Sequence, residues 1–131
     1  MKNKLAIVQA VYYEDIASEM WSGAMTEIRI NQQKLNNKII GNIEDFFVTG
    51  VFEIPVIISK NIKKFDAFIA LGCVIKGETP HFEFISKSTI NAIMKLSVNY
   101  KKPIGNGIIT CLNKKQAIER ASSGKKNKGK D

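Results

Sequence analysis

The sequence has few of the residues that build metal sites, disulfide frameworks and membrane spans. Its single histidine, His81, excludes a site made from several histidines. Its two cysteines, Cys73 and Cys111, lie in apolar runs, which favours buried thiols in a reducing compartment over a disulfide. No apolar run reaches the roughly 20 residues that cross a bilayer, and no secretory cleavage site follows the N-terminus. We therefore expect a cytoplasmic protein with no membrane partner.

Two common nucleotide-binding motifs are also absent. The chain contains neither the G-x-G-x-x-G pattern of dinucleotide-binding folds nor the G-x-x-x-x-G-K-[ST] loop that binds nucleotide phosphates. Any ligand with a phosphate group must therefore be bound by other means.

The positive charge is large and unevenly distributed. The formal net charge is +8, and from residue 114 onward seven basic residues are accompanied only by Glu119 and Asp131. Such a balance is compatible with nucleic acid, an anionic surface or an anionic small substrate, while a solvated tail is the plainer alternative for the last six residues. No aromatic residue is interleaved with the tail lysines, which disfavours base stacking. We expect no nucleic-acid partner.

Short apolar runs alternate with helix-like stretches along the chain. The apolar runs predict strands near residues 5–8, 46–48, 65–75 and 104–110. Apolar residues at helical spacing predict helices from about residue 14, from residue 53, after Thr79 and Pro80, and after Asn113. Thr79 is the expected N-cap and Pro80 the first residue of the third helix. The polar segment 31–42 is predicted to be a loop or a frayed helix end.

This alternation predicts a three-layer α/β/α domain of the flavodoxin-like type, with a central parallel four-stranded sheet. The length suits one domain over residues 1–131, and 44% hydrophobic residues can form its core. Ligands bind such sheets beyond the carboxyl ends of the strands. The segments expected there are 12–13, 49–53, 73–81 and 104–106, which together predict the active site.

Several side chains at these predicted ends suit binding or proton transfer. His81 is either a structural residue or an acid/base that works near neutral pH. The backbone of residues 77–79, before a helix, could bind phosphate. Glu53 is either a carboxylate that stabilises a helix start or a partner for a ligand. Tyr12 and Tyr13 could stack on a flat heterocycle or pack within the protein.

Four segments resemble the lumazine synthase family in order and spacing. They are residues 48–55 (V-T-G-V-F-E-I-P), 70–82 (A-L-G-C-V-I-K-G-E-T-P-H-F), 103–110 and 116–121, and the similarity extends over residues 5–129. The resemblance implies a transferase of riboflavin biosynthesis. Its reaction condenses 5-amino-6-(D-ribitylamino)uracil with 3,4-dihydroxy-2-butanone 4-phosphate, without metal or cofactor, to give 6,7-dimethyl-8-ribityllumazine, phosphate and water.

The resemblance also implies roles for particular residues. His81 matches the catalytic histidine. The residues that match the pyrimidine and ribityl site are Tyr12, Val51, Phe52, Glu53, Cys73, Val74, Ile75 and, from a neighbouring subunit, Asn106. Those that match the phosphate site are Glu78, Thr79, Arg120 and Lys128. Because the family's site is shared between subunits, the resemblance implies a homopentamer, with a larger capsid and riboflavin synthase as further candidate partners.

Three residues depart from the family's usual pattern. Thr49 replaces a proline, which should cost loop rigidity only. Asn106 stands where many members have phenylalanine, so one stacking wall is expected to be missing. Tyr13 replaces a common asparagine. The sequence stops at Asp131, where the family continues, so we expect the C-terminal helix to be shortened or absent.

Two other function classes remain as alternatives to the enzyme. A non-catalytic module of the same fold could bind lumazine or flavin, although the presence of His81 and Arg120 argues against it. The basic tail could bind nucleic acid, in which case binding would depend steeply on salt.

Overall fold

The computed structural model describes residues 3–34, 40–77 and 81–122. The elements in chain order are β1 (Asn3–Ala10), α1 (Glu14–Lys34), β2 (Ile40–Val48), the 3-10 turn η1 (Val51–Glu53), α2 (Ile54–Asn61), β3 (Ala67–Ile75), α3 (Phe82–Tyr100), β4 (Ile104–Cys111) and α4 (Lys114–Ala121). None of the described helices is both long and apolar enough to span a membrane.

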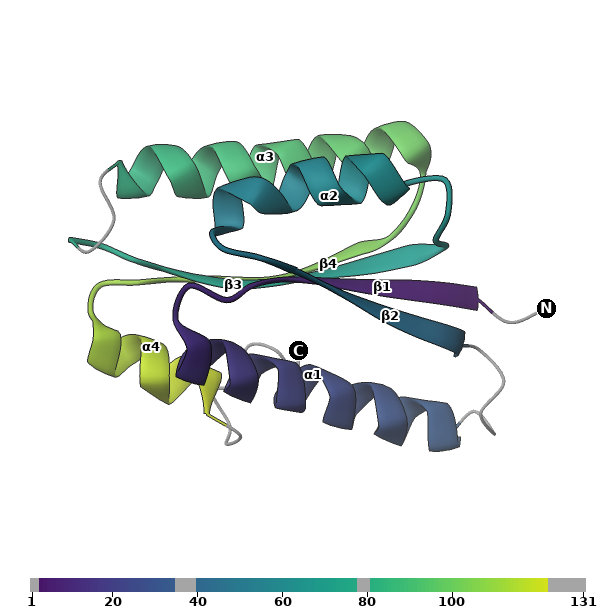
Figure 1. Ribbon diagram of the computed structural model, residues 1–131, viewed down its shortest axis with the longest axis horizontal. Helices are drawn as coiled ribbons and strands as arrows, with labels where there is room; N and C mark the ends of the chain where they lie inside the picture. Colours follow the sequence, from purple (N-terminus) through teal and green to yellow (C-terminus); the bar gives the residue numbers. More distant parts are fainter. Residues whose placement is uncertain (1–2, 35–39, 78–80, 123–131) are drawn as a thin grey trace.

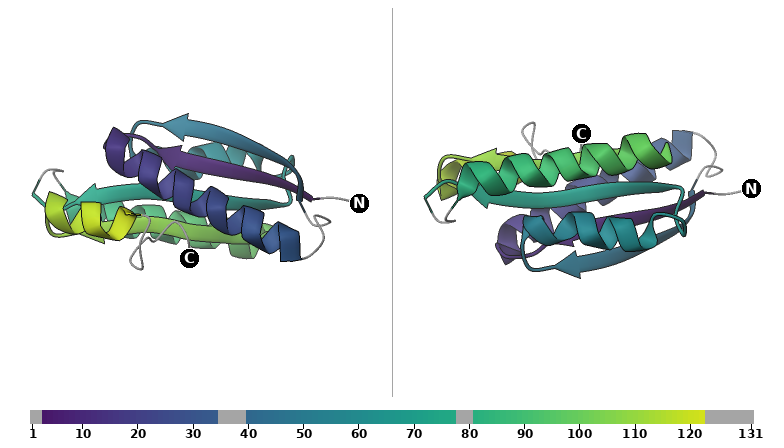
Figure 2. Two further views of the ribbon diagram at one scale, coloured as in Figure 1. Left: turned by 90° about the horizontal axis from the view of Figure 1, so that it is seen from below. Right: turned by 90° about the horizontal axis from the view of Figure 1, so that it is seen from above.

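The four strands form one parallel sheet in the order β2-β1-β3-β4. Helices α2 and α3 cover one face of this sheet, and α1 and α4 cover the other (Figure 1; Figure 2). The three-layer arrangement predicted from the sequence is therefore confirmed. The chain winds outward from β1 to β2 and then crosses back to β3 on the other side of β1. The winding direction thus changes between β1 and β3.

The core has two layers because successive side chains of a strand point to opposite faces of the sheet. On the α2/α3 face, Val8 and Phe68 pack with Ile54 of α2. On the α1/α4 face, Ile7 packs with Met20 of α1. The six residues 5–10 of β1 are all buried, as expected of a central strand covered on both faces.

The loop predicted for residues 31–42 is much shorter than expected. Helix α1 continues to Lys34 and β2 begins at Ile40, while residues 35–39 lie outside the described part. The exposed Asn31 shows that polar residues can extend a helix where its surface faces solvent. Strand β2 pairs only with β1 within the sheet, so polar residues such as Asn42 and Glu44 can remain exposed on it.

The prediction that segment 104–106 lies at a carboxyl strand end is wrong. Ile104 begins β4 and pairs with Phe68 near the start of β3. The carboxyl end of β4 is Cys111, seven residues later. The apolar run marked the strand correctly. Because β4 begins directly after Pro103, however, residues 104–106 belong to the amino-terminal half of the strand.

The predicted start of α4 is confirmed, whereas that of α3 is not. Asn113 caps α4 as expected, since its Oδ1 accepts a hydrogen bond from the backbone N–H of Gln116 at 2.8 Å. Helix α3 instead begins at Phe82 with His81 as its N-cap, later than predicted. Thr79 and Pro80, the expected cap and first helical residue, lie outside the described residues.

Candidate active site

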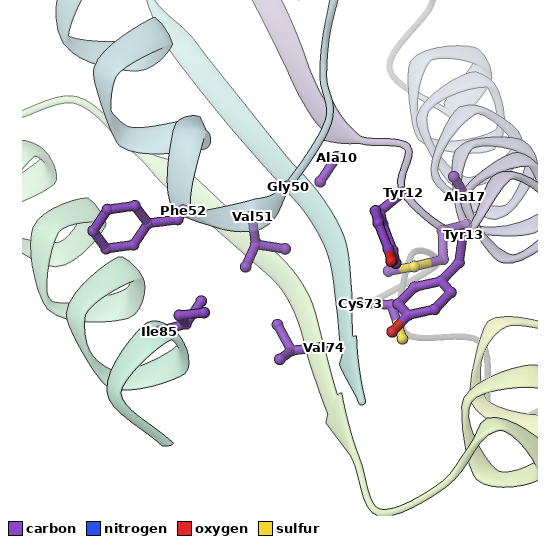
Figure 3. Close-up of a pocket in the computed structure, with 11 residues that line it drawn as sticks. Ala10, Tyr12, Tyr13, Ala17, Gly50, Val51, Phe52, Cys73, Val74 and Ile85 are labelled. Atoms are coloured by element: carbon purple, nitrogen blue, oxygen red, sulfur yellow. The ribbon is translucent and has the colours of Figure 1, made fainter. Parts of the chain in front are cut away.

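A pocket of about 230 Å³ opens at the carboxyl ends of β1 and β3, where the winding direction of the sheet changes (Figure 3). Ligands bind at this position in open α/β sheets. Side chains from both helical layers reach it, because α1 contributes from one face and α3 from the other. The lining residues are Ala10, Tyr12, Tyr13, Ala17, Met20, Gly50, Val51, Phe52, Cys73, Val74 and Ile85.

Aromatic side chains are exposed at the pocket. Tyr12 is 63% exposed and meets Tyr13 edge to face, with ring centroids 4.9 Å apart. Phe52 is 57% exposed, and its ring lies 6.5 Å from that of Phe84 between centroids. Large aromatic surfaces left open to solvent can stack on a flat heterocycle. The structure thus brings the predicted residues Tyr12 and Phe52 to one pocket.

The inner wall of the pocket depends on the absence of a side chain at Gly72. Val51 and Val74, both predicted, are buried here and line the pocket. A Cβ atom at Gly72 would lie 2.5 Å from Cγ1 of Val51, closer than real contacts allow. Glycine on β3 therefore lets η1 pack directly on the sheet. Ile75 is 1% exposed and its side chain lies in the core, so only its backbone could contact a ligand.

Glu53 holds the loop that carries this wall. Its Oε2 accepts hydrogen bonds from the backbone N–H of Thr49 at 2.9 Å and of Gly50 at 3.0 Å. The Glu53 side chain is exposed and is not part of the pocket lining. This matches the helix-start alternative drawn from the sequence, while its contact with a ligand stays a prediction. The loop that positions Val51 thus closes on Glu53.

Replacing Glu53 with alanine should lower the free energy of unfolding by about 1 kcal/mol, because two backbone N–H groups lose their acceptor. Urea unfolding measures this loss, and hydrogen exchange should become faster at the Thr49 and Gly50 amides. Glu53→Gln keeps one carbonyl oxygen and is the matched control, with an intermediate effect. Unchanged exchange at both amides in the alanine variant would show that the loop does not rely on this carboxylate.

Three side chains in hydrogen-bond contact, Cys73, Cys111 and Arg120, connect the pocket to α4. Cys73 on β3 lines the pocket and is half-buried rather than buried as predicted. Because Cys73 pairs with Ile109, Cys111 follows two residues along β4 on the same face of the sheet. The buried Cys111 thiol has side-chain hydrogen bonds with Cys73 and Arg120. Both cysteines are thiols, in agreement with the sequence prediction.

Arg120 reaches the carboxyl end of β4 from α4. Its Nη1 donates a hydrogen bond to the backbone carbonyl of Thr110 at 2.9 Å, and the side chain is half-buried. This bond fixes part of the guanidinium and leaves its other N–H groups for further partners, since arginine has five donors. Through Cys111 and Cys73, the cation lies close to one wall of the pocket.

Burial raises the pKa of the Cys111 thiol above its ordinary value of 9.0, and the nearby Arg120 opposes this only in part. The folded protein therefore keeps the proton more tightly than the unfolded chain. This stabilisation is complete below pH 9.0 and is lost as the pH rises above it. We expect the free energy of unfolding to decrease above that pH, and urea unfolding across the range measures the slope. Cys111→Ala should flatten this slope; an equal slope in both proteins would contradict the assignment.

His81 occupies an unusual backbone conformation at the start of α3. With φ 62° and ψ 36° it lies in the left-handed region, which is uncommon for residues other than glycine. Its carbonyl accepts the backbone N–H of Ile85 at 2.9 Å, and Ile85 lines the pocket one turn into the helix. The exposed His81 is therefore close to the pocket along the chain but is not part of its lining.

The structure does not bring every predicted residue to the pocket. Asn106 is exposed in the amino-terminal half of β4, where its Oδ1 accepts the backbone N–H of Ile108 at 3.0 Å. It is not part of this pocket's lining, and its predicted role from a neighbouring subunit stays a prediction. Glu78, Thr79 and Lys128, predicted for the phosphate, lie outside the described residues.

Sequence reasoning missed much of the lining itself. Small and apolar residues such as Ala10, Ala17 and Ile85 carry no chemical signal of their own. Helical periodicity identified Met20 as inward-facing but could not show that its end of α1 borders a pocket. Among the described residues, no three or more His, Cys, Asp or Glu side chains are grouped so that they could hold a metal ion.

Comparison with known proteins gives a consistent result. A family model described as 6,7-dimethyl-8-ribityllumazine synthase matches residues 2–131. The 6,7-dimethyl-8-ribityllumazine synthase of Bartonella tribocorum is 38% identical over 131 residues, covering 98% of this chain and 82% of that protein. The 6,7-dimethyl-8-ribityllumazine synthase 1 of Rhodopseudomonas palustris is 41% identical, covering 98% and 78%. The protein of the same name from Corynebacterium urealyticum is 37% identical, covering 88% and 74%.

Proposed function

The chain belongs to the 6,7-dimethyl-8-ribityllumazine synthase family, and we propose that it carries out the family's reaction at the pocket between β1 and β3. The reaction is a transferase step of riboflavin biosynthesis. It condenses 5-amino-6-(D-ribitylamino)uracil with 3,4-dihydroxy-2-butanone 4-phosphate and releases phosphate and water. The observation that carries the proposal is that Tyr12, Phe52 and Cys73 line one pocket, at the point where the winding direction of the sheet changes.

The pyrimidine would lie against the exposed aromatic rings. The uracil ring is flat, and the exposed rings of Tyr12 and Phe52, which both line the pocket, offer stacking partners. The backbone of residues 51–53 and 73–75 would hydrogen-bond the ring and the ribityl chain. Gly50, which has no side chain, keeps the approach to this backbone open.

The butanone phosphate would lie toward Arg120. Its guanidinium has donors beyond the one engaged by Thr110, and charge-assisted hydrogen bonds to phosphate are stronger than neutral ones. The N-terminal end of α3 would add backbone N–H groups that favour an anion. By family resemblance Glu78, Thr79 and Lys128 complete this half of the site.

The reaction needs the two substrates to be held together and protons to be transferred. It needs no external oxidant or reductant. The 5-amino group attacks the ketone and forms an imine with loss of water. Phosphate then leaves by elimination, which creates a new carbonyl group. The ribitylamino nitrogen attacks this carbonyl and closes the second ring with loss of a second water. Holding two reactive partners side by side supplies much of the acceleration. His81, beside the pocket at the start of α3, would move protons between the intermediates.

Assembly into a homopentamer, with a site shared between subunits, is part of this proposal. Five large apolar side chains are exposed over η1, α2 and α3, namely Phe52, Val56, Phe84, Met94 and Val98. An apolar surface of this kind favours contact with another subunit. Asn106, which is not part of the pocket lining, could then serve the pocket of a neighbour. A capsid of pentamers and an association with riboflavin synthase extend the proposal, with the cytoplasm as the compartment.

A direct assay tests the proposal. Purified protein is mixed with both substrates, lumazine fluorescence is followed, and native mass is measured. We expect product above the spontaneous background from an assembly with a multiple of five subunits. His81→Ala should be slower yet still active, because proximity of the substrates persists. An assembled pentamer that binds lumazine without forming it would favour the non-catalytic binding module. Absence of both product and binding would reject the pocket assignment.

A further inference from the structure

A cluster of lysines covers the end of the molecule opposite the pocket. Lys4, Lys60, Lys63, Lys64 and Lys101 are all exposed there. They come from the start of β1, the end of α2 with its following turn, and the end of α3 (Figure 1). We call these five residues the basic end. One phosphate-bearing substrate at the opposite end of the sheet does not account for them.

Hydrogen bonds between the segments hold the basic end together. The Lys102 ammonium donates to the carbonyls of Ile62 and, at 2.8 Å, of Phe65, which joins the turn after α3 to the turn after α2. The backbone N–H of Lys4 donates to Asp66 Oδ2 at 2.8 Å, which joins β1 to the same turn. The lysines therefore belong to one surface of the folded protein, although 96 residues lie between Lys4 and Lys101 in the chain.

The segments that carry the basic end hold little negative charge of their own. Across segments 3–10, 54–67 and 92–104 the only acidic residue is Asp66, whose carboxylate already accepts the Lys4 backbone N–H. Within the described part of the chain, none of the five ammonium groups of the basic end forms an ion pair. Solvent ions gather around such a group of like charges, and a polyanion could displace those ions with a gain in entropy.

An aromatic residue adjoins these charges. Tyr100, the last residue of α3, is 45% exposed and directly precedes Lys101. The basic tail beyond residue 122 has no such aromatic residue. Lysines bind phosphates as flexible point charges, and an exposed ring can stack on a base. An acidic protein segment would use the charges but not the ring.

The sequence analysis predicted no nucleic-acid partner because no aromatic residue accompanies the tail lysines. Since Tyr100 does accompany the basic end, we propose instead that this surface binds single-stranded nucleic acid without sequence specificity, as a second activity separate from lumazine formation. Lysines from separate elements contact successive phosphates, and Tyr100 stacks on an unpaired base. Each lysine neutralises one phosphate, so the logarithm of the affinity should fall against the logarithm of the salt concentration with a slope of about −3.5 for five contacts.

The test is fluorescence anisotropy with the full chain and a labelled single-stranded RNA of about 20 nucleotides, titrated between about 50 and 200 mM salt. Lys63→Gln/Lys64→Gln/Lys101→Gln should weaken binding at least tenfold at the lower salt and reduce the slope by about 2. Tyr100→Ala should weaken binding while leaving the slope unchanged. Lumazine formation should be unaffected in both variants, which also shows that they are folded.

Two matched variants separate this proposal from general attraction by a basic protein. Lys87→Gln/Lys114→Gln/Lys115→Gln removes three exposed charges at other places, and Lys125→Gln/Lys126→Gln/Lys130→Gln removes three from the tail. Neither should change the affinity by more than about twofold. An equal loss in either variant would overturn the basic end as the binding site. Binding to polyglutamate or to anionic vesicles in place of RNA would overturn the choice of partner.

Discussion

Replacing Arg120 with alanine should lower kcat/KM for the butanone phosphate by about 10- to 100-fold, because a charge-assisted hydrogen bond to phosphate contributes about 1.5–3 kcal/mol. The guanidinium is already held at the end of β4 by its bond to the Thr110 carbonyl. It would therefore bind the phosphate with little further loss of conformational freedom. Steady-state kinetics with the butanone phosphate varied and the pyrimidine saturating measures the effect.

The specificity of this loss is what identifies the role of Arg120. The KM for the pyrimidine should change little, and Arg120→Lys should recover part of the rate, since lysine restores the charge without the paired donors. The substitution also removes the hydrogen bond to the Thr110 carbonyl. Urea unfolding of each variant measures how much stability is lost for that reason. Equal loss for both substrates, or full activity in Arg120→Ala, would show that the phosphate is bound elsewhere.

Replacing Gly72 with alanine should both destabilise the protein and impair pyrimidine binding. The new methyl group would lie 2.5 Å from Cγ1 of Val51 and 3.4 Å from Cβ of Ala10, so η1 must move away from β3. Overpacking of this kind costs about 1–3 kcal/mol. Since Val51 lines the pocket, its displacement should raise the KM for the pyrimidine more than that for the butanone phosphate.

Gly105 on β4 provides the matched control for Gly72. A Cβ there would be 3.7 Å from its nearest neighbour, Cγ1 of Ile69, which is an ordinary contact. Gly105→Ala should therefore leave the free energy of unfolding within about 1 kcal/mol of the wild type or raise it slightly. Urea unfolding and substrate kinetics of both variants are compared. Equal changes in stability and in KM for the pyrimidine in both variants would show that the pocket does not depend on the close approach of η1 to β3.

The layers of the fold could be predicted because they follow from local periodicity. Ile16, Met20, Ala24 and Ile28 recur at helical spacing, and all four are buried on α1. The apolar runs likewise marked all four strands. The same patterns misjudged segment 31–42, where exposed polar residues extend both α1 and β2, since an edge strand and a solvent-facing helix end need no apolar signal.

The candidate site could be predicted only where its residues lie at the carboxyl end of a strand or shortly after it. Tyr12, Val51, Phe52, Cys73 and Val74 were all predicted, and all line the pocket. Topology placed Asn106 at a strand end by mistake, because an apolar run shows where a strand lies but not which of its residues borders a ligand. Glu53 illustrates a further limit. The sequence does not distinguish a carboxylate that binds a ligand from one that accepts hydrogen bonds from its own loop. Glu53 accepts two such bonds, from backbone N–H groups.

The sequence by itself determined the class of fold, the family and several residues of the pocket wall, because these depend on patterns within short segments of chain. Only the tertiary structure decided the strand order, the contact of Cys73 with Cys111 and Arg120, and the gathering of Lys4 and Lys101 at one end. These features join residues that are far apart in the chain. Their positions follow from which strands pair, in which register, and from how closely the helices pack, and no local pattern encodes those choices.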